Sequence, residues 1–248
     1  MTALRDISHP PAEPTQVGPR RPTSEPDGRP LLLGHGGRLT VEWLGRVAYR
    51  PTWDLQNELA DRRRRREIGD RVLLLEHEPV YTIGRGGDEG NLLATPERLA
   101  SLGVELVRID RGGDITFHGP GQLVAYPIVE LRDPLDLRRY VRTLEAAIIL
   151  TAASFGVQAD RVDGRPGVWV DGARKLAAVG VRVRRGVTTH GLALNVSTDL
   201  AWFGEMIPCG LPDIEVTSLG RELGEAPAMA TVADRLADDL AEVFGLRR

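Results

Sequence analysis

Residues 111–122 read Arg-Gly-Gly-Asp-Ile-Thr-Phe-His-Gly-Pro-Gly-Gln and form the most informative stretch of the chain. Four of these residues are glycines, so the backbone must turn tightly here or let a ligand approach closely, because a Cβ would obstruct either. Arg111 and His118 add polar groups to the stretch. The pattern matches neither the dinucleotide-binding fingerprint nor the P-loop, so it does not support binding of nucleotide phosphates. A plain glycine-rich connection that leads into a strand at 123–128 is the alternative.

Outward from this stretch in both directions, short apolar runs of β-strand character alternate with a few segments of helical periodicity. Too few strand–helix–strand alternations occur for a parallel doubly wound sheet, and the order favours an α+β domain with a mostly antiparallel or mixed sheet flanked by helices. Gly156 suits a left-handed cap at the end of one helix. The sequence predicts strands over Leu39–Leu44, Val72–Leu75, Val80–Ile83, Leu123–Ile128, Gly167–Val170, Leu176–Val183 and Thr188–Val196, and helices over Thr52–Glu67, Leu137–Phe155 and Thr231–Phe244.

Composition excludes several classes of function. The 248 residues carry a formal net charge of -3 with a sequence pI of about 6.0, so the chain lacks the basic surface that a nucleic-acid binder needs to neutralise phosphates. Cys209 is the single cysteine, which excludes an internal disulfide and a cysteine-rich zinc or iron–sulfur site. A lone thiol also fits a reducing compartment. We expect no metal centre and no nucleic-acid partner.

The first 30 residues differ from the rest of the chain. They hold seven of the 17 prolines and no aromatic residue, so they cannot bury enough apolar surface to offset the entropy of ordering. We expect a disordered proline-rich tail over residues 1–30 and a globular domain over residues 31–248. The tail has no apolar signal-peptide core, and no apolar run approaches the roughly 20 residues of a transmembrane helix. The sequence therefore predicts a cytoplasmic protein without a membrane partner.

The only lysine, Lys175, and the only cysteine, Cys209, are candidates for chemistry. The strong bias towards arginine reflects coding composition, but a desolvated lysine can give up a proton near neutral pH whereas arginine cannot. Lys175 leads into small apolar residues at 176–181, beside a poorly solvated surface that favours the neutral amine. Cys209 lies in a Pro-Cys-Gly turn, which favours a partly exposed thiol over the buried cysteine that is the common alternative. A nucleophilic cysteine needs a nearby base or cation, and Lys175 is the natural partner.

Two further segments have both a functional and a structural interpretation. Residues 189–196 alternate like a strand, and Gly191 with Ala193 would leave space above the sheet for a narrow apolar ligand. Close packing of a neighbouring helix explains the same small residues. Arg62–Arg66 is a run of five arginines on an expected helix, most of which must face solvent. The run would also suit docking of an acidic partner protein.

The chain resembles the lipoyl(octanoyl) transferases, which are the octanoyl-[acyl carrier protein]:protein N-octanoyltransferases of the lipoate-protein ligase B family. The resemblance suggests an actinobacterial member of this family. Four segments carry the resemblance in the same order, namely RGGDITFHGPGQL (111–123), KLAAVGV (175–181), HGLALNV (190–196) and PCGL (208–211). The stretch EHEPVYTIG (76–84) adds to it, and the resemblance covers about residues 39–244. One departure is Phe117, where the family commonly has tyrosine, so that a hydroxyl is lost and the aromatic ring is kept.

The resemblance implies the fold of the biotin and lipoate protein ligases, in which the sheet supports a ligand tunnel. It implies an acyltransferase in which Cys209 takes the octanoyl group from the phosphopantetheine of octanoyl-acyl carrier protein, and in which Lys175 assists the thiol and then moves protons. The acceptors are lysines of apo lipoyl domains, on E2 subunits of 2-oxoacid dehydrogenases and on the glycine cleavage H protein. No cofactor is implied, because a thioester is exchanged for a thioester and then for a more stable amide. The implied substrate-binding residues are Arg111, Gly112, Gly113, Asp114, Ile115, Thr116, Phe117, His118, Ala178, Val179, Gly180, Gly191, Leu192 and Ala193.

Three other activities fit parts of the same pattern. An octanoyl amidotransferase between lipoyl-domain proteins would also use a cysteine. An ATP-dependent lipoate or biotin protein ligase activates a free acid as an adenylate and needs no cysteine, so Cys209 and the HGPGQ segment favour the transferase. A non-catalytic acyl or carrier-protein binder would keep a pocket but would have no use for a paired thiol and amine.

Overall fold

Strands with apolar residues on both faces form the centre of the molecule. In the computed structural model, which describes residues 37–131, 137–207 and 214–248, all of β6 and the run Val72–Leu75 of β2 are buried. Such continuous apolar strands belong in a sheet that is covered on both faces. The large sheet has the order β1-β2-β6-β10-β9-β8-β7, with β11 paired to β9. Its strands are β1 (Thr40–Val47), β2 (Arg71–His77), β6 (Gln122–Ile128), β7 (Asp160–Val162), β8 (Arg165–Val170), β9 (Arg174–Arg184), β10 (Val187–Asn195) and β11 (Glu215–Val216).

The large sheet is mixed and mostly antiparallel. Each neighbouring pair from β2 across to β7 runs antiparallel. The edge strand β1 runs parallel to β2, and the short β11 runs parallel to β9. This arrangement, with helices on both faces, confirms the predicted α+β fold.

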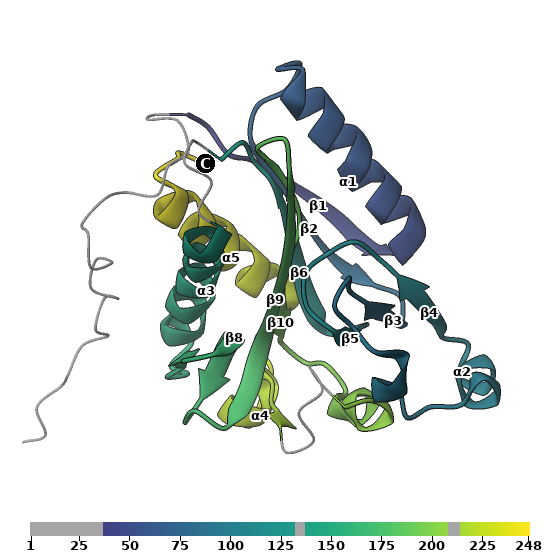
Figure 1. Cartoon of the computed structure of the whole chain (residues 1–248). Helices are drawn as coiled ribbons and strands as arrows, with labels where there is room; N and C mark the ends of the chain where they lie inside the picture. Colours follow the sequence, from purple (N-terminus) through teal and green to yellow (C-terminus); the bar gives the residue numbers. More distant parts are fainter. Residues whose placement is uncertain (1–36, 132–136, 208–213) are drawn as a thin grey trace, which may run out of the picture.

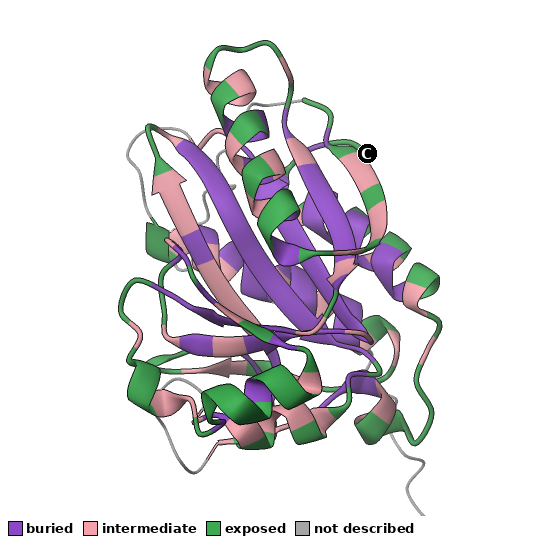
Figure 2. Cartoon of the chain, turned by 90° about the vertical axis from the view of Figure 1, so that its right-hand side faces the viewer, coloured by how far each residue is buried: buried purple, intermediate pink, exposed green. Residues whose placement is uncertain are grey.

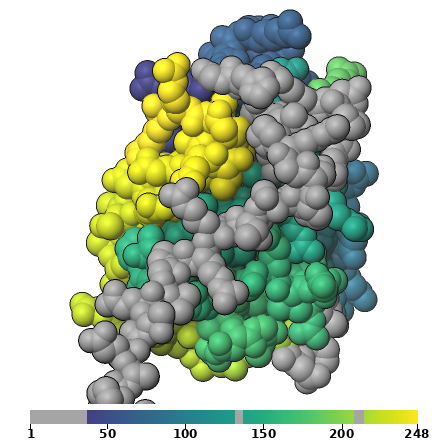
Figure 3. Space-filling view, turned by 90° about the vertical axis from the view of Figure 1, so that its left-hand side faces the viewer, coloured from purple at the N-terminus to yellow at the C-terminus, as the bar shows by residue number. Residues whose placement is uncertain are grey.

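Helices cover the two faces of the large sheet. α3 (Leu137–Ser154) and α5 (Met229–Phe244) lie on one face, and α1 (Tyr49–Arg64) lies on the other (Figure 1). The main core lies under α3 and α5 and contains the fully buried Leu144, Ile148, Leu236 and Leu240. Figure 2 shows the α1 side, with buried strands behind the helix. Figure 3 shows the opposite side in space-filling form, with the yellow atoms of α5 beside the teal and green atoms of α3 and neighbouring strands.

A second, smaller sheet has the order β4-β3-β5 and packs beside the large one. Its core contains the buried Tyr81, Ile83, Ile115 and Phe117. β3 follows β2 after only the Glu78-Pro79 step, so the chain leaves the large sheet at the point where a proline cannot donate to a strand ladder. The remaining elements are β3 (Val80–Ile83), β4 (Glu105–Arg108), β5 (Ile115–His118), α2 (Pro96–Leu102), α4 (Leu219–Leu223) and the 3-10 turns η1 (Glu89–Asn91) and η2 (Leu200–Glu205).

The observed elements differ from the expected ones mainly at their ends. α1 begins at Tyr49 rather than Thr52, because Pro51 falls in the first turn, where backbone N–H groups have no partner in the helix. The helix ends at Arg64 rather than Glu67, and Arg66 adopts a φ of 61°. Part of the glycine-rich stretch, over which no strand was predicted, is the strand β5. β4, β7 and α2 were not predicted from the sequence, because they are short and lack a clear period.

The two ends of the described fold are joined by backbone hydrogen bonds. The Leu39 N–H donates to Arg247 O at 2.8 Å, and the Arg247 N–H donates to Gly37 O at 3.0 Å. These bonds form a parallel bridge between Arg38 and Arg247. The start of β1 is therefore fixed by residues more than 200 positions away.

Two expectations concern the chain outside this fold. The tail predicted over residues 1–30 lies outside the described residues. Within the described part, no helix combines the length and apolar character that crossing a membrane requires.

Candidate active site

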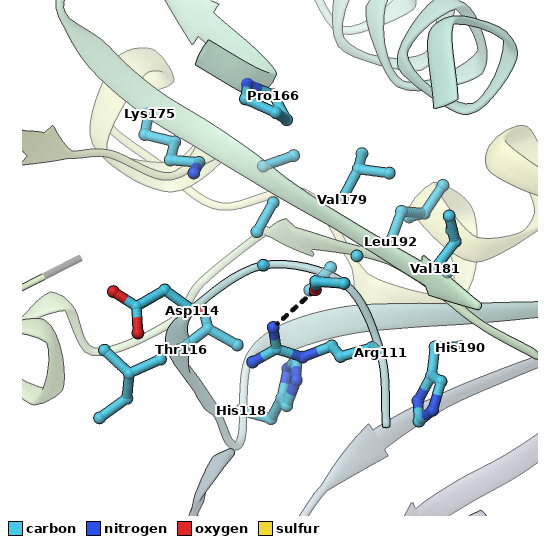
Figure 4. A pocket seen from close by; sticks show the side chains of 18 of the residues that line it. Arg111, Asp114, Thr116, His118, Pro166, Lys175, Val179, Val181, His190 and Leu192 are labelled. Carbon is cyan, nitrogen blue, oxygen red and sulfur yellow. Dashed lines mark hydrogen bonds between the residues drawn. The ribbon is translucent and has the colours of Figure 1, made fainter. Parts of the chain in front are cut away.

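A cavity of about 510 Å³ lies between the large sheet and the segment that leads into β5. This volume falls in the usual range of small-molecule sites. Lys175 reaches from β9 on one side of the space, and Arg111, Asp114 and His118 lie on the other (Figure 4). The lining includes Lys175 and Ala177–Val181 of β9, His190–Ala193 and Asn195 of β10, Arg111–Thr116 and His118, Leu137 and Val141 of α3, and Phe203 and Met206 of η2 and the residue after it.

Small residues on β9 and β10 face this cavity in pairs. Gly180 is opposite Gly191, and Ala178 is opposite Ala193. A Cβ on Gly180 would come within 3.0 Å of Arg111 Cδ, so glycine lets the Arg111 segment lie against β9. Position 191 requires glycine for a different reason, because a Cβ there would lie 2.1 Å from Ala125 O on the neighbouring strand. Close packing inside the sheet therefore explains the glycine at position 191, although Gly191 also lines the cavity.

The segment from Arg111 to Asp114 is held by backbone and side-chain hydrogen bonds. The Gly112 N–H donates to Val181 O at 3.0 Å, which attaches the segment to β9 beyond the part of that strand paired with β8. Arg111 is buried, and its Nη2 donates to Thr82 O at 2.8 Å and to Thr82 Oγ1 at 2.9 Å. A positive charge is thus held at the wall of the cavity by a strand of the small sheet.

Three buried histidines lie at or next to this site: His118 and His190 line the cavity, and His77 contacts the lining residue Tyr126. Burial lowers the pKa of His118 to about 3 and that of His77 to about 4, so both imidazoles are neutral at pH 7. His118 Nδ1–H donates to Gln122 Oε1 at 2.7 Å. His190 has a φ of 58° and bonds to Asp110 Oδ1 through Nε2 at 2.8 Å. His118 is therefore placed to hydrogen-bond as a neutral group rather than to carry charge.

Lys175 stands near the start of β9, buried and on the wall of the cavity. Its carbonyl accepts from the Thr217 N–H at 2.9 Å, which ties β9 to the chain after β11. Cys209 lies outside the described residues. Met206, three positions before it, and Val216, seven positions after it, both line the same cavity as Lys175.

Of the other predicted binding residues, all but Phe117 line the cavity. β5 alternates, so Phe117 points into the core of the small sheet while its neighbours Thr116 and His118 face the opposite side. The Phe117 ring stacks on Trp202 at 5.0 Å and tilts against Tyr81 at 5.3 Å. Phe117 is therefore a core residue. The position at which this chain has phenylalanine instead of the family's common tyrosine does not lie on the cavity wall.

Several lining residues were not predicted from the sequence. Tyr49 and Tyr126 come from α1 and β6, and Leu137 and Val141 come from α3. Nothing in the local sequence distinguishes these residues from ordinary core positions, because the fold alone brings them to the cavity. His77 was part of the resembling stretch, and its Nε2 lies 2.8 Å from the hydroxyl of the lining residue Tyr126.

The arginine run at the end of α1, Arg62–Arg66, is largely matched by acidic residues of the same chain. Arg63 bonds to Asp70 at 2.7 Å and to Glu130 at 2.8 Å. Arg62, Arg64 and Arg65 form ion pairs with Glu58, Asp61 and Glu67, respectively. Much of the charge of the run is therefore offset within the chain, and docking of an acidic partner there stays a prediction.

Comparison with known proteins identifies the family and the fold of this chain. Residues 48–241 match the family model of the lipoyl protein ligase A/B catalytic domain. The octanoyltransferase of Chloroflexus aurantiacus is 52% identical over 211 residues, which cover 84% of this chain and 95% of that protein. The octanoyltransferase of Mycolicibacterium gilvum is 50% identical over 211 residues, which cover 82% and 84%. The bipartite lipoate protein ligase of Thermoplasma acidophilum, at 17% identity and a TM-score of 0.62 over 87% of this chain and 86% of that chain, shows the same fold.

The family match covers the small sheet, every strand of the large sheet except β1, and all described residues that line the cavity. The full-length relatives at about half identity share one enzymatic activity in their names. The chain belongs to the lipoyl protein ligase A/B catalytic domain family, and within it to the acyltransferases of the octanoyltransferase type.

Proposed function

We propose that this protein transfers the octanoyl group from the phosphopantetheine thioester of octanoyl-acyl carrier protein to the target lysine of apo lipoyl domains, through a thioester on Cys209. It acts in the cytoplasm as the first step of endogenous protein lipoylation. The observation that carries the proposal is that Lys175, Met206 and Val216 line the same cavity, with Cys209 between the last two in the sequence. Thiol and amine would then meet at one end of the acyl site.

The chemistry divides into two balanced steps. The neutral Lys175 amine takes the thiol proton of Cys209, the thiolate attacks the thioester carbonyl, and Lys175 returns the proton to the leaving pantetheine sulfur. In the second step the acceptor amine attacks the acyl-enzyme, and its proton passes through Lys175 to the thiolate of Cys209 as the amide forms. Arginine at 175 would stabilise a thiolate but could not accept its proton. No ATP or other cofactor enters either step.

The proposed acyl site is the cavity itself. Its wall is built of glycine, alanine, valine and leucine on β9 and β10, which suits an alkyl chain. Acceptors of the proposed reaction are the lipoyl domains of 2-oxoacid dehydrogenase E2 subunits and of the glycine cleavage H protein. Support comes from the Thermoplasma acidophilum ligase, whose structure is described together with its E2 lipoyl domain.

The test is a reconstituted transfer without ATP. Octanoyl-acyl carrier protein mixed with the enzyme should add one octanoyl group, which hydroxylamine removes, and apo lipoyl domain should then receive it. Cys209→Ala should show neither the adduct nor transfer in mass spectrometry. An acyl adduct retained in Cys209→Ala would refute the proposal. A requirement for ATP and free octanoate would indicate a ligase, and donation from octanoyl lipoyl domain alone would indicate an amidotransferase.

A further inference from the structure

Trp169 on β8 stands directly beside Lys175. The two residues are paired across β8 and β9, and directly opposite residues on neighbouring strands carry their side chains on the same face of a sheet. The Lys175 Nζ lies 5.2 Å from the centroid of the Trp169 ring. Trp169 is 1% exposed and Lys175 is 8% exposed, so the contact is shielded from water.

A β-bulge creates this pairing. Val168 is opposite Ala177, but Trp169 is opposite Lys175, so Leu176 is an extra residue on β9. Without the extra residue, Lys175 would lie on the same face as Ala177, which belongs to the core under α3 and α5. The bulge turns Lys175 to the other face, and bulges beside active sites often re-aim a side chain in this way. Leu176 takes its place in the core.

The backbone of β8 also encloses the stem of Lys175. Gly167 has a φ of 113°, and a Cβ there would lie 3.0 Å from Lys175 Cε and 2.4 Å from Ala177 O. The Gly167 N–H donates at 2.9 Å to Glu145, a carboxylate on α3 that is 1% exposed. Glu145 also pairs with Arg142 and Arg161, each at 3.2 Å. The strand behind Lys175 is therefore anchored to a helix by a buried carboxylate.

We propose that Trp169 is a positioning residue for Lys175, whose amine it holds at the cavity wall through the face of its ring. This inference rests on the proposed function, in which Lys175 moves protons. Trp169 does not line the cavity among the described residues, so its effect passes through Lys175 rather than through the substrate. Loss of the ring should then lower kcat and leave KM for the octanoyl donor unchanged.

Three substitutions separate the ring from the bulk of the side chain. Trp169→Phe keeps an aromatic face, and its kcat should stay within roughly threefold of the parent value. Trp169→Leu and Trp169→Met fill much of the space without a ring. In both variants kcat should fall by about 3- to 30-fold, the range expected when a desolvated ammonium, which Lys175 becomes once it holds the thiol proton, loses a cation–π contact. Val170→Ala is the matched control, because it removes buried volume from the same strand but faces the core under α3 and α5. Thermal midpoints are measured for all four variants.

The proposal is overturned if Trp169→Leu and Trp169→Met have the same kcat as Trp169→Phe, or if Val170→Ala reproduces their loss at an equal fall in thermal midpoint. A double-mutant cycle gives the second readout. In a Lys175→Ala background, Trp169→Leu should cause no further loss of the residual transfer rate, and a full additive loss also overturns the proposal. Failure of the proposed function is distinct, because Lys175→Ala would then by itself retain parent activity.

Discussion

At the residue scale, all basic residues of the Lys/Arg type in this chain are arginines except Lys175, and that one lysine lies at the wall of the cavity. Arginine is longer, holds its proton at any physiological pH and makes a planar set of hydrogen bonds. A site that needed only a positive charge would accept it. Substitution at position 175 can therefore distinguish a role in charge from a role in proton transfer.

Lys175→Arg should keep Cys209 reactive with iodoacetamide near neutral pH, because in the proposed mechanism a cation would remain beside the thiol. Octanoyl transfer should nevertheless fall by roughly 10² to 10⁴, the loss expected when a general acid–base is removed. Lys175→Ala should lower both alkylation and transfer. Alkylation followed by mass spectrometry and the transfer assay give the two readouts.

Arg174→Gln is the control for this pair of variants. It removes a neighbouring cation that pairs with Glu222 and Asp171 and does not line the cavity among the described residues, so both readouts should stay near those of the parent. Full transfer by Lys175→Arg would assign the lysine to charge alone.

Phe117 shows that a sequence motif does not determine which of its side chains face the ligand. The order of residues 111–118 predicted a ligand-contacting segment, and its described members do line the cavity apart from Phe117. Which side chain faces the ligand depends on whether residues 115–118 form a loop or a strand. The strand is formed by pairing with β3, more than 30 residues earlier, and no local pattern reports that pairing.

At the element scale, the sequence predicted the strands that are apolar on both faces and the long helices with a clear period. β6, β9, β10, α3 and α5 lie close to their expected ranges. The small sheet was harder to predict, because β4 and β5 have four residues each and their partners are distant in the sequence. The bulge at Leu176 was also invisible, since it depends on the register between β8 and β9.

Gly191→Ala tests how closely β10 and β6 approach one another. The added methyl would lie 2.1 Å from Ala125 O and 2.8 Å from Pro127 Cδ, so the strands must move apart. We expect a loss of at least about 1–3 kcal/mol, as for other overpacked cores, and a thermal midpoint lower by several degrees. Gly69→Ala is the control, because no atom lies within 4 Å of its Cβ position. Equal midpoints in the two variants would contradict the expected clash.

At the scale of the whole molecule, the buried histidines make stability depend on pH. His77 and His118 titrate near 6.5 in the unfolded chain but at about 4 and about 3 in the fold, because burial disfavours their charged forms. Between pH 6.5 and 4 the unfolded state therefore binds more protons. The free energy of unfolding should fall as the pH falls through this window, by up to about 1.4 kcal/mol per pH unit for each histidine.

Urea unfolding at several pH values between 7.5 and 4.5 measures this dependence. His77→Gln should be less stable than the parent at pH 7.5, because it loses the bond to Tyr126, but its stability should change less steeply with pH. Parallel curves for the two proteins would show that His77 does not contribute.

The bridge between Arg38 and Arg247 bears on how the protein is made. Residues 37–39 are synthesised early, but the backbone groups of residue 247 that bond to them are added more than 200 residues later. Contacts between residues so far apart in the chain form slowly, and an edge strand without its partners is open to pairing with other chains. During synthesis, residues 37–39 therefore stay without these backbone partners while more than 200 further residues are added.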